Sequence, residues 1–157
     1  MEDKKKKMGV FFKLHNADII EYSEKNFSEY GFKATDVKKG PCEIGFNIKG
    51  SPKKGLISIF LMAKFYLKQN KKNYELFTIE TVHKFKIKNF SATFKPNKKG
   101  KMLYNMPDMF VKHILGIAIG GTRGMLIASN KNPRYKNIIL PLLDISKLLD
   151  SYKRKIT

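Results

Sequence analysis

Three consecutive segments of this chain alternate apolar and polar residues, and short turns separate them. The clearest is 42–49, where apolar side chains occupy every even position from Cys42 to Ile48. Residues 56–69 and 74–88 continue with the same period of two, and the polar run 70–73 lies between them. Because a parallel pair of strands needs a long crossover, connections this short predict an antiparallel sheet.

A further strand is expected ahead of these three. Apolar residues alternate from Val10 onward, and Ile20 and Tyr22 are expected to carry the same face beyond a bulge near residues 16–17. A charged loop follows over 26–40 and ends at Gly40-Pro41. The sheet is therefore predicted to have four strands.

The C-terminal part of the sequence is typical of helices. Residues 109–129 are largely apolar, with Asn105 as a candidate cap and Pro107 in the first turn. Four glycines in this stretch either break the helix or allow it to pack closely against another backbone. An apolar segment follows over 138–143, and Asp144 caps a short helix that runs to about residue 155.

These elements define an α+β fold, in which a four-stranded antiparallel sheet is followed by a long helix, a crossover loop and a short C-terminal helix. At 157 residues the chain fits one domain, expected over 10–157, after a disordered basic tail over 1–9. No signal peptide or membrane-spanning run is found, so no membrane insertion is expected. The single cysteine, Cys42, excludes an internal disulfide and favours a reducing, cytoplasmic location.

The net charge of +19 comes from 32 basic and 13 acidic residues. A charge of this size attracts polyanions, including nucleic acid and acidic proteins. However, nearly all the basic residues are lysines, and compositional drift across a whole proteome would produce the same excess. The charge alone leaves these two interpretations open.

Catalytic and metal chemistry find no support in the residue pattern. His15, His83 and His113 lie far apart in the sequence, without a carboxylate or second histidine at ligand spacing. Cys42 falls on the apolar side of its strand, where a thiol behaves as a small hydrophobic group. We therefore expect a protein that acts by binding and not as an enzyme, without a metal or another cofactor.

The sequence from Gly121 to Gly124 matches the GXXG loop of KH domains, which clamp a nucleic-acid backbone. That loop joins two helices interleaved with strands in a fixed order, whereas here four strands come first. No strand–helix–strand unit surrounds the glycines, which also argues against a dinucleotide site.

The order of elements resembles the SecB-type protein-export chaperones. The resemblance is strongest over 114–152. Thr122-Arg123 falls where the family's main helix carries an Ala-Arg or Thr-Arg pair. Residues 138–144, with Pro141, are similar to the family's apolar segment before its final helix. Residues 10–49 agree only in layout.

This resemblance implies a homo-oligomer, a tetramer built as a dimer of dimers, that holds unfolded polypeptides in apolar grooves for export. It also implies that no nucleotide and no metal are used. SecB itself is acidic and meets the basic end of the SecA motor, whereas this chain is basic, so a SecA partnership does not follow directly. Relatives of SecB also serve as dedicated chaperones of an antitoxin, and a basic chain could equally serve one acidic client.

The predicted client-binding residues come from two surfaces. The first is the second face of the third strand, and the second is the apolar segment around Pro141: Phe60, Met62, Tyr66, Ile139, Leu140, Leu142 and Leu143. Methionine and aromatic residues suit a promiscuous surface, because they repack against varied partners. The interpretation of this second segment as ordinary core is left open. The alternative function is a basic nucleic-acid-binding domain.

Overall fold

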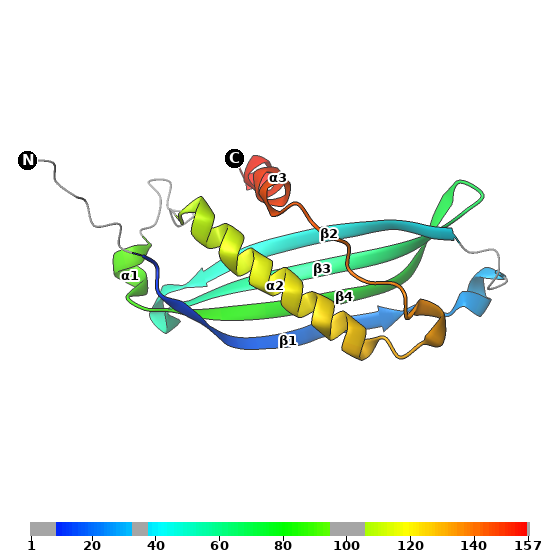
Figure 1. Cartoon of the computed structure of the whole chain (residues 1–157), viewed down its shortest axis with the longest axis horizontal. Coiled ribbons are helices and arrows are strands. Elements are labelled where there is room, and N and C mark those ends of the chain that lie inside the picture. The colour runs from blue at the N-terminus through cyan, green and yellow to red at the C-terminus, as the bar shows by residue number, and fades with distance from the viewer. Residues whose placement is uncertain (1–8, 33–37, 95–105, 157) are drawn as a thin grey trace, which may run out of the picture.

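The computed structural model describes residues 9–32, 38–94 and 106–156 (Figure 1). Its centre is a four-stranded antiparallel sheet with the order β1-β4-β3-β2. The strands are β1 (Phe12–Glu24), β2 (Lys38–Ser51), β3 (Leu56–Gln69) and β4 (Lys72–Ile87). The predicted basic tail lies mostly outside the described residues, which begin at residue 9. The α+β class and the order of elements are confirmed.

The β3–β4 hairpin forms the middle of the sheet. Asn70 and Lys71 both have positive φ, at 48° and 64°, which is the backbone of a tight hairpin turn. Both strands are long, and each pairs along its outer side with one edge strand. Strand β1 pairs with β4, and β2 pairs with β3. Short 3-10 turns, η1 (Phe27–Tyr30) and η3 (Pro52–Lys54), lie at the strand ends.

Strand β1 contains two irregularities in its register, where the sequence predicted one. The first, between Leu14 and Asn16, lies beside the expected position and confirms that bulge. The second lies between Ile19 and Glu21 and returns the alternation to its first phase. The expectation that Ile20 shares the apolar face is therefore wrong, because Ile19 takes that place opposite Thr81 and Ile20 is half exposed.

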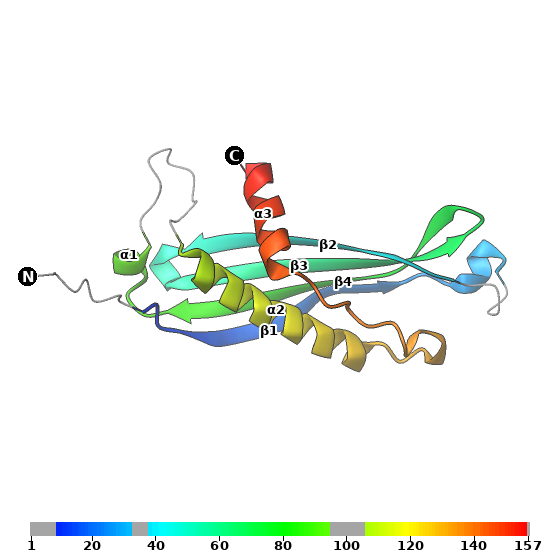
Figure 2. The same cartoon turned by 45° about the horizontal axis from the view of Figure 1, so that its top comes forward.

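Helix α2 (Asp108–Ser129) crosses one face of the sheet without a break, so the four glycines do not interrupt it (Figures 1 and 2). Pro107 occupies the N-cap position and not the first turn as predicted, and the predicted cap, Asn105, lies outside the described residues. The Gly121–Gly124 sequence lies inside this helix. It therefore cannot form the loop between helices that a KH domain requires.

By length and composition, α2 is also apolar enough to cross a membrane. Eight of its residues are buried in this structure, including Phe110, Ile114 and Leu126. Packing against the sheet accounts for this apolar composition, and the absence of membrane insertion stays a prediction.

The chain after α2 passes through a short turn, η4 (Pro133–Tyr135), and then an extended segment that leads to helix α3 (Ile145–Ile156). Asp144 caps α3 as predicted, since its Oδ1 accepts a hydrogen bond from the Lys147 amide at 3.1 Å. The Asn130 side chain donates to the Tyr135 carbonyl at 2.7 Å and so fixes the turn. A four-residue helix that was not predicted, α1 (Phe90–Thr93), follows β4.

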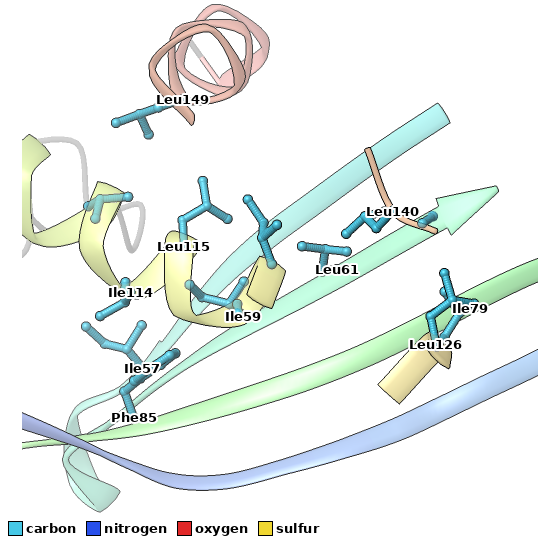
Figure 3. Close-up of a cluster of buried hydrophobic side chains, with 14 of the residues drawn as sticks. Ile57, Ile59, Leu61, Ile79, Phe85, Ile114, Leu115, Leu126, Leu140 and Leu149 are labelled. Carbon is cyan, nitrogen blue, oxygen red and sulfur yellow. The ribbon is translucent and has the colours of Figure 1, made fainter. Parts of the chain in front are cut away.

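One hydrophobic core fills the space between the sheet and the helices (Figure 3). The odd-numbered residues of β3, such as Ile59 and Leu61, point toward α2 and are fully buried. Leu149 of α3 is also buried and points toward α2 (Figure 3). The helices α2 and α3 thus lie on the same face of the sheet, and no described element covers the opposite face (Figure 2).

Candidate functional site

The structure divides the predicted client-binding residues between opposite faces of the sheet. Phe60 and Met62 alternate with the buried residues of β3, so they lie on the face away from the helices, where both are half buried. Residues 139–143 lie on the helix side. Phe60 and Met62 therefore cannot join residues 139–143 in one continuous site within a single chain, whereas Tyr66 and Ile139 line the same pocket.

Within the extended segment before α3, neighbouring residues differ sharply in exposure. Leu142 is 92% exposed and Ile139 is 46% exposed, whereas only 1% of Leu140 is accessible. Leu143 is half buried and packs against the core. Leu140 is therefore a core residue and cannot contact a client, so its assignment to the client site is wrong. The alternative interpretation as core is wrong for Leu142.

Arg123 of α2 holds this segment in place. Its Nε donates to the Leu140 carbonyl at 3.2 Å, and its Nη2 donates to the Pro141 carbonyl at 3.0 Å. Hydrogen bonds from a charged donor are stronger than neutral ones, and the planar guanidinium spans two acceptors at once. Sequence reasoning noted Arg123 only as part of a family pair and missed this role, because backbone acceptors leave no signal in the sequence.

A pocket of about 150 Å³ lies between this segment and β2. We call it the crossover pocket, and it is lined by Gly40, Cys42, Phe65, Tyr66, Ile138, Ile139 and Pro141. The register of β2 shifts between Lys39 and Cys42 at this point. A Cβ on Gly40 would lie 2.6 Å from the Tyr66 carbonyl oxygen, so only glycine allows this close approach.

Helix α3 packs against the edge strand β2, beside the extended segment over 138–143, here called the crossover segment. The Tyr152 ring stacks on Phe46 of β2 with centroids 4.7 Å apart. At its far end, α3 is tied to the start of α2 by Lys153, whose Nζ lies 2.6 Å from Oδ1 of Asp108. The hydrogen bond from Lys153 holds the pKa of Asp108 below its ordinary value. The apolar face of β2 is therefore partly covered, and it is open at the crossover pocket.

His83 lies in the middle of the sheet, directly beneath α2. It is fully buried, and neither ring nitrogen has a hydrogen-bond partner. A Cβ on Gly121 would lie 2.3 Å from His83 Nε2, so the glycine makes room for the ring. Burial lowers the pKa of His83, which keeps the imidazole neutral. Beside it, the Thr81 and Thr122 hydroxyls share a hydrogen bond of 2.7 Å.

Three consecutive residues of α2 thus connect the core to the candidate site. Gly121 accommodates His83, Thr122 bonds to Thr81, and Arg123 fastens the crossover segment. The sequence suggested close packing at the glycines, and the structure confirms it at Gly121, with a side chain as the neighbour instead of a backbone.

Chemistry of other kinds finds no site in the described residues. Across residues 9–32, 38–94 and 106–156, no three His, Cys, Asp or Glu side chains come close enough to hold a metal ion. His113 is exposed and contacts the Phe12 ring edge-on at 5.5 Å. The wall of the crossover pocket consists mostly of apolar side chains, so the pocket suits an apolar group.

No family model matches the chain, and no curated protein matches it in sequence. Among solved structures, the chain is similar to Rv1957, a SecB-like chaperone of Mycobacterium tuberculosis in complex with a ChAD peptide from the HigA1 antitoxin. The identity is 6% and the TM-score 0.46, over 84% of this chain and 90% of that one. It is also similar to a protein of unknown function from Streptococcus agalactiae, with 14% identity and a TM-score of 0.26, over 85% and 99% of the two chains. At these values neither likeness says what this chain binds.

Proposed function

We propose that this protein is an ATP-independent chaperone of the SecB-like type, which holds unfolded or partly folded polypeptides by their apolar segments. The observation that carries the proposal is Leu142, which is 92% exposed on a segment that Arg123 fixes beside the crossover pocket. A large apolar side chain held rigidly in water, next to an apolar pocket and the half-exposed Ile139, is typical of a contact surface for a partner.

The size of the crossover pocket favours one apolar side chain of the client. A cavity of about 150 Å³ can hold a ring the size of benzene. Burial of apolar surface contributes about 25 cal/mol per Å², so a client that covers Leu142 and fills the pocket gains affinity without nucleotide or metal. The function proposed is therefore binding, without a catalytic step.

We further propose that the protein works as a homo-oligomer, with a tetramer as the expected form. Large apolar side chains are exposed on β1 and α2 as well as near the pocket: Leu14, Ile19, Ile20, Met109 and Ile127. Exposed apolar residues spread over two elements exceed what one client site needs, and contact with further copies would cover them.

The net charge of the chain favours some clients and partners over others. The net charge of +19 favours clients with acidic stretches, and a dedicated antitoxin client or a general export client in the cytoplasm would both fit. The same charge would repel the basic end of the SecA motor, so SecA is the less favoured partner. Identification by mass spectrometry of proteins that co-purify with the tagged chain separates these possibilities.

The client site is tested by Leu142→Ser, with Phe11→Ser as the matched control. Both replace an exposed apolar residue by the same polar one, and Phe11, 71% exposed just ahead of β1, does not line the crossover pocket. We expect Leu142→Ser to weaken suppression of aggregation of a denatured test protein and Phe11→Ser to retain it. Equal activity of the two variants would contradict the assignment.

The alternative function, a basic nucleic-acid-binding domain, is distinguished from the chaperone function by how binding depends on salt concentration. Binding led by lysine–phosphate contacts weakens steeply as salt rises, because counterions are released, whereas apolar burial resists salt. We expect aggregation suppression to persist at high salt. Tight oligonucleotide binding with no suppression at any salt concentration would favour the alternative.

A further inference from the structure

The face of the sheet opposite α2 and α3, here called the open face, carries charges that are divided along the strands. Alternation and register place one set of side chains there in rows across the sheet. One half of the open face carries only basic charge: Lys13, Lys49, Lys84 and Lys86. The other half carries the acidic residues Glu21, Glu43, Glu75 and Glu80, and Asp18 lies in the Phe60 row between the two halves.

The rows show how sharp this division is. Lys84 belongs to the row Asn16–Lys84–Ser58–Lys49, which holds no acidic residue. Two rows further along, Glu80 lies between Glu21 and Met62. The acidic half also holds Lys64, which lies opposite Glu43, and Lys68, near the far end of β3. The two ion pairs found among the described residues both lie elsewhere, on the helix side.

An apolar strip separates the two halves. Phe60 and Met62 of β3 are half buried, and Val82 of β4 lies opposite Phe60. The residue of β2 beside Met62 is Gly45, which adds no side chain to the strip. Lys49 reaches over the Phe60 ring, with Nζ 5.0 Å from its centroid, and brings positive charge to the edge of the strip.

We propose that the open face docks onto the open face of a second copy of this chain, about a two-fold axis that crosses the strands near Phe60. This axis reverses the strand direction, so the lysine half of each copy faces the acidic half of the other. Lys84 then meets Glu80 of the second copy, and the same pair recurs by symmetry. The two Phe60 rings meet at the axis, in a sandwich with sheets about 10 Å apart.

Charge complementarity selects this occupant and this axis. An axis parallel to the strands would place lysine over lysine and acid over acid throughout, which is unfavourable, whereas the proposed axis brings only Asp18 opposite its own copy. A polyanion would fit the lysine half but would be repelled by Asp18, Glu21 and Glu80. The proposal rests on the homo-oligomer suggested above and names one interface of it, while the client site on the helix side is left uncovered.

Charge reversal tests the interface. Lys84 and Glu80 are four residues apart on one strand, about 13 Å, so they do not pair within a chain. Lys84→Glu and Glu80→Lys should each weaken self-association about tenfold, because two symmetric ion pairs become repulsive. The double variant, which keeps the wild-type net charge, and an equimolar mixture of the two single variants should both restore it. Lys136→Glu, an exposed lysine outside the open face, controls for net charge.

Sedimentation velocity at low salt gives the association constants, and circular dichroism checks folding. A monomeric wild-type protein, single variants that associate normally, or a double variant as weak as the singles would each overturn the proposal. Loss of oligonucleotide binding in Lys84→Glu, with the wild type monomeric, would assign the lysine half to nucleic acid instead. Suppression of aggregation is measured on the same samples. If Lys84→Glu still suppresses aggregation, the chaperone function does not depend on this interface. The two proposals can then fail separately.

Discussion

Replacing Gly121 by alanine should affect the stability of the fold in two opposite ways. Alanine favours a helix over glycine by about 1 kcal/mol, so the change should stabilise α2 if nothing stood in the way. However, the new Cβ would lie 2.3 Å from His83 Nε2 and 3.1 Å from its Cδ2. The ring is fully buried and cannot swing into solvent, so α2 or β4 must shift. Overpacking of this kind costs about 1–3 kcal/mol.

The same helix supplies the controls. A Cβ added at Gly120 or Gly124 would meet no atom within 4 Å, so alanine at either site should raise the free energy of unfolding by up to about 1 kcal/mol. We expect Gly121→Ala to be less stable than Gly120→Ala by about 1–3 kcal/mol in urea titrations. In a His83→Ala background the difference should nearly vanish. If Gly121→Ala is as stable as Gly120→Ala with His83 present, the described contact between α2 and the sheet is wrong.

Three further predictions concern the crossover segment, its bond to Arg123, and the buried His83. Leu140→Ala should lose about 2–5 kcal/mol of stability, whereas Leu142→Ser should stay within about 0.5 kcal/mol of wild type in thermal or urea melts; equal losses would contradict the exposure difference. Arg123→Lys should raise amide hydrogen exchange over 138–143 and leave β3 unchanged, because lysine cannot span both carbonyls; unchanged exchange would exclude the clamp. The folded-state pKa of His83 is lowered, so its neutral form stabilises the fold above about pH 6.5. That contribution should fall by up to about 1.4 kcal/mol per pH unit below this value, and His83→Ala should remove this part of the pH dependence of urea midpoints.

The fold could be predicted because its signals are local. The alternation in 56–69 and the polar turn after it are properties of neighbouring residues, and the structure places β3 over the same bounds. Strand β2 begins at Lys38, before the predicted start at Cys42, because pairing with β3 extends it through Pro41. The second bulge of β1, which moves Ile20 out of the apolar face, depends on its fit to β4 and leaves no pattern in the sequence.

The candidate site could be predicted only as a segment. Composition marked 138–143 as apolar, but an extended segment next to a proline has no fixed period, so Leu140 and Leu142 looked alike. Their opposite exposures follow from Arg123, which holds the Leu140 and Pro141 carbonyls from another element. Similarly, alternation showed that Phe60 faces away from Leu61, but it could not show on which side the crossover segment would lie.

Whether a client occupies the crossover pocket can be measured through Cys42, the sole cysteine of the chain. Cys42 is half exposed and lines the pocket, so its rate of alkylation by a small maleimide can be measured without adding any other label. With a saturating unfolded client, we expect this rate to fall at least about tenfold in the wild type, and much less in Leu142→Ser at the same client concentration. If a saturating, demonstrably bound client leaves the alkylation rate unchanged, the client does not occupy the crossover pocket.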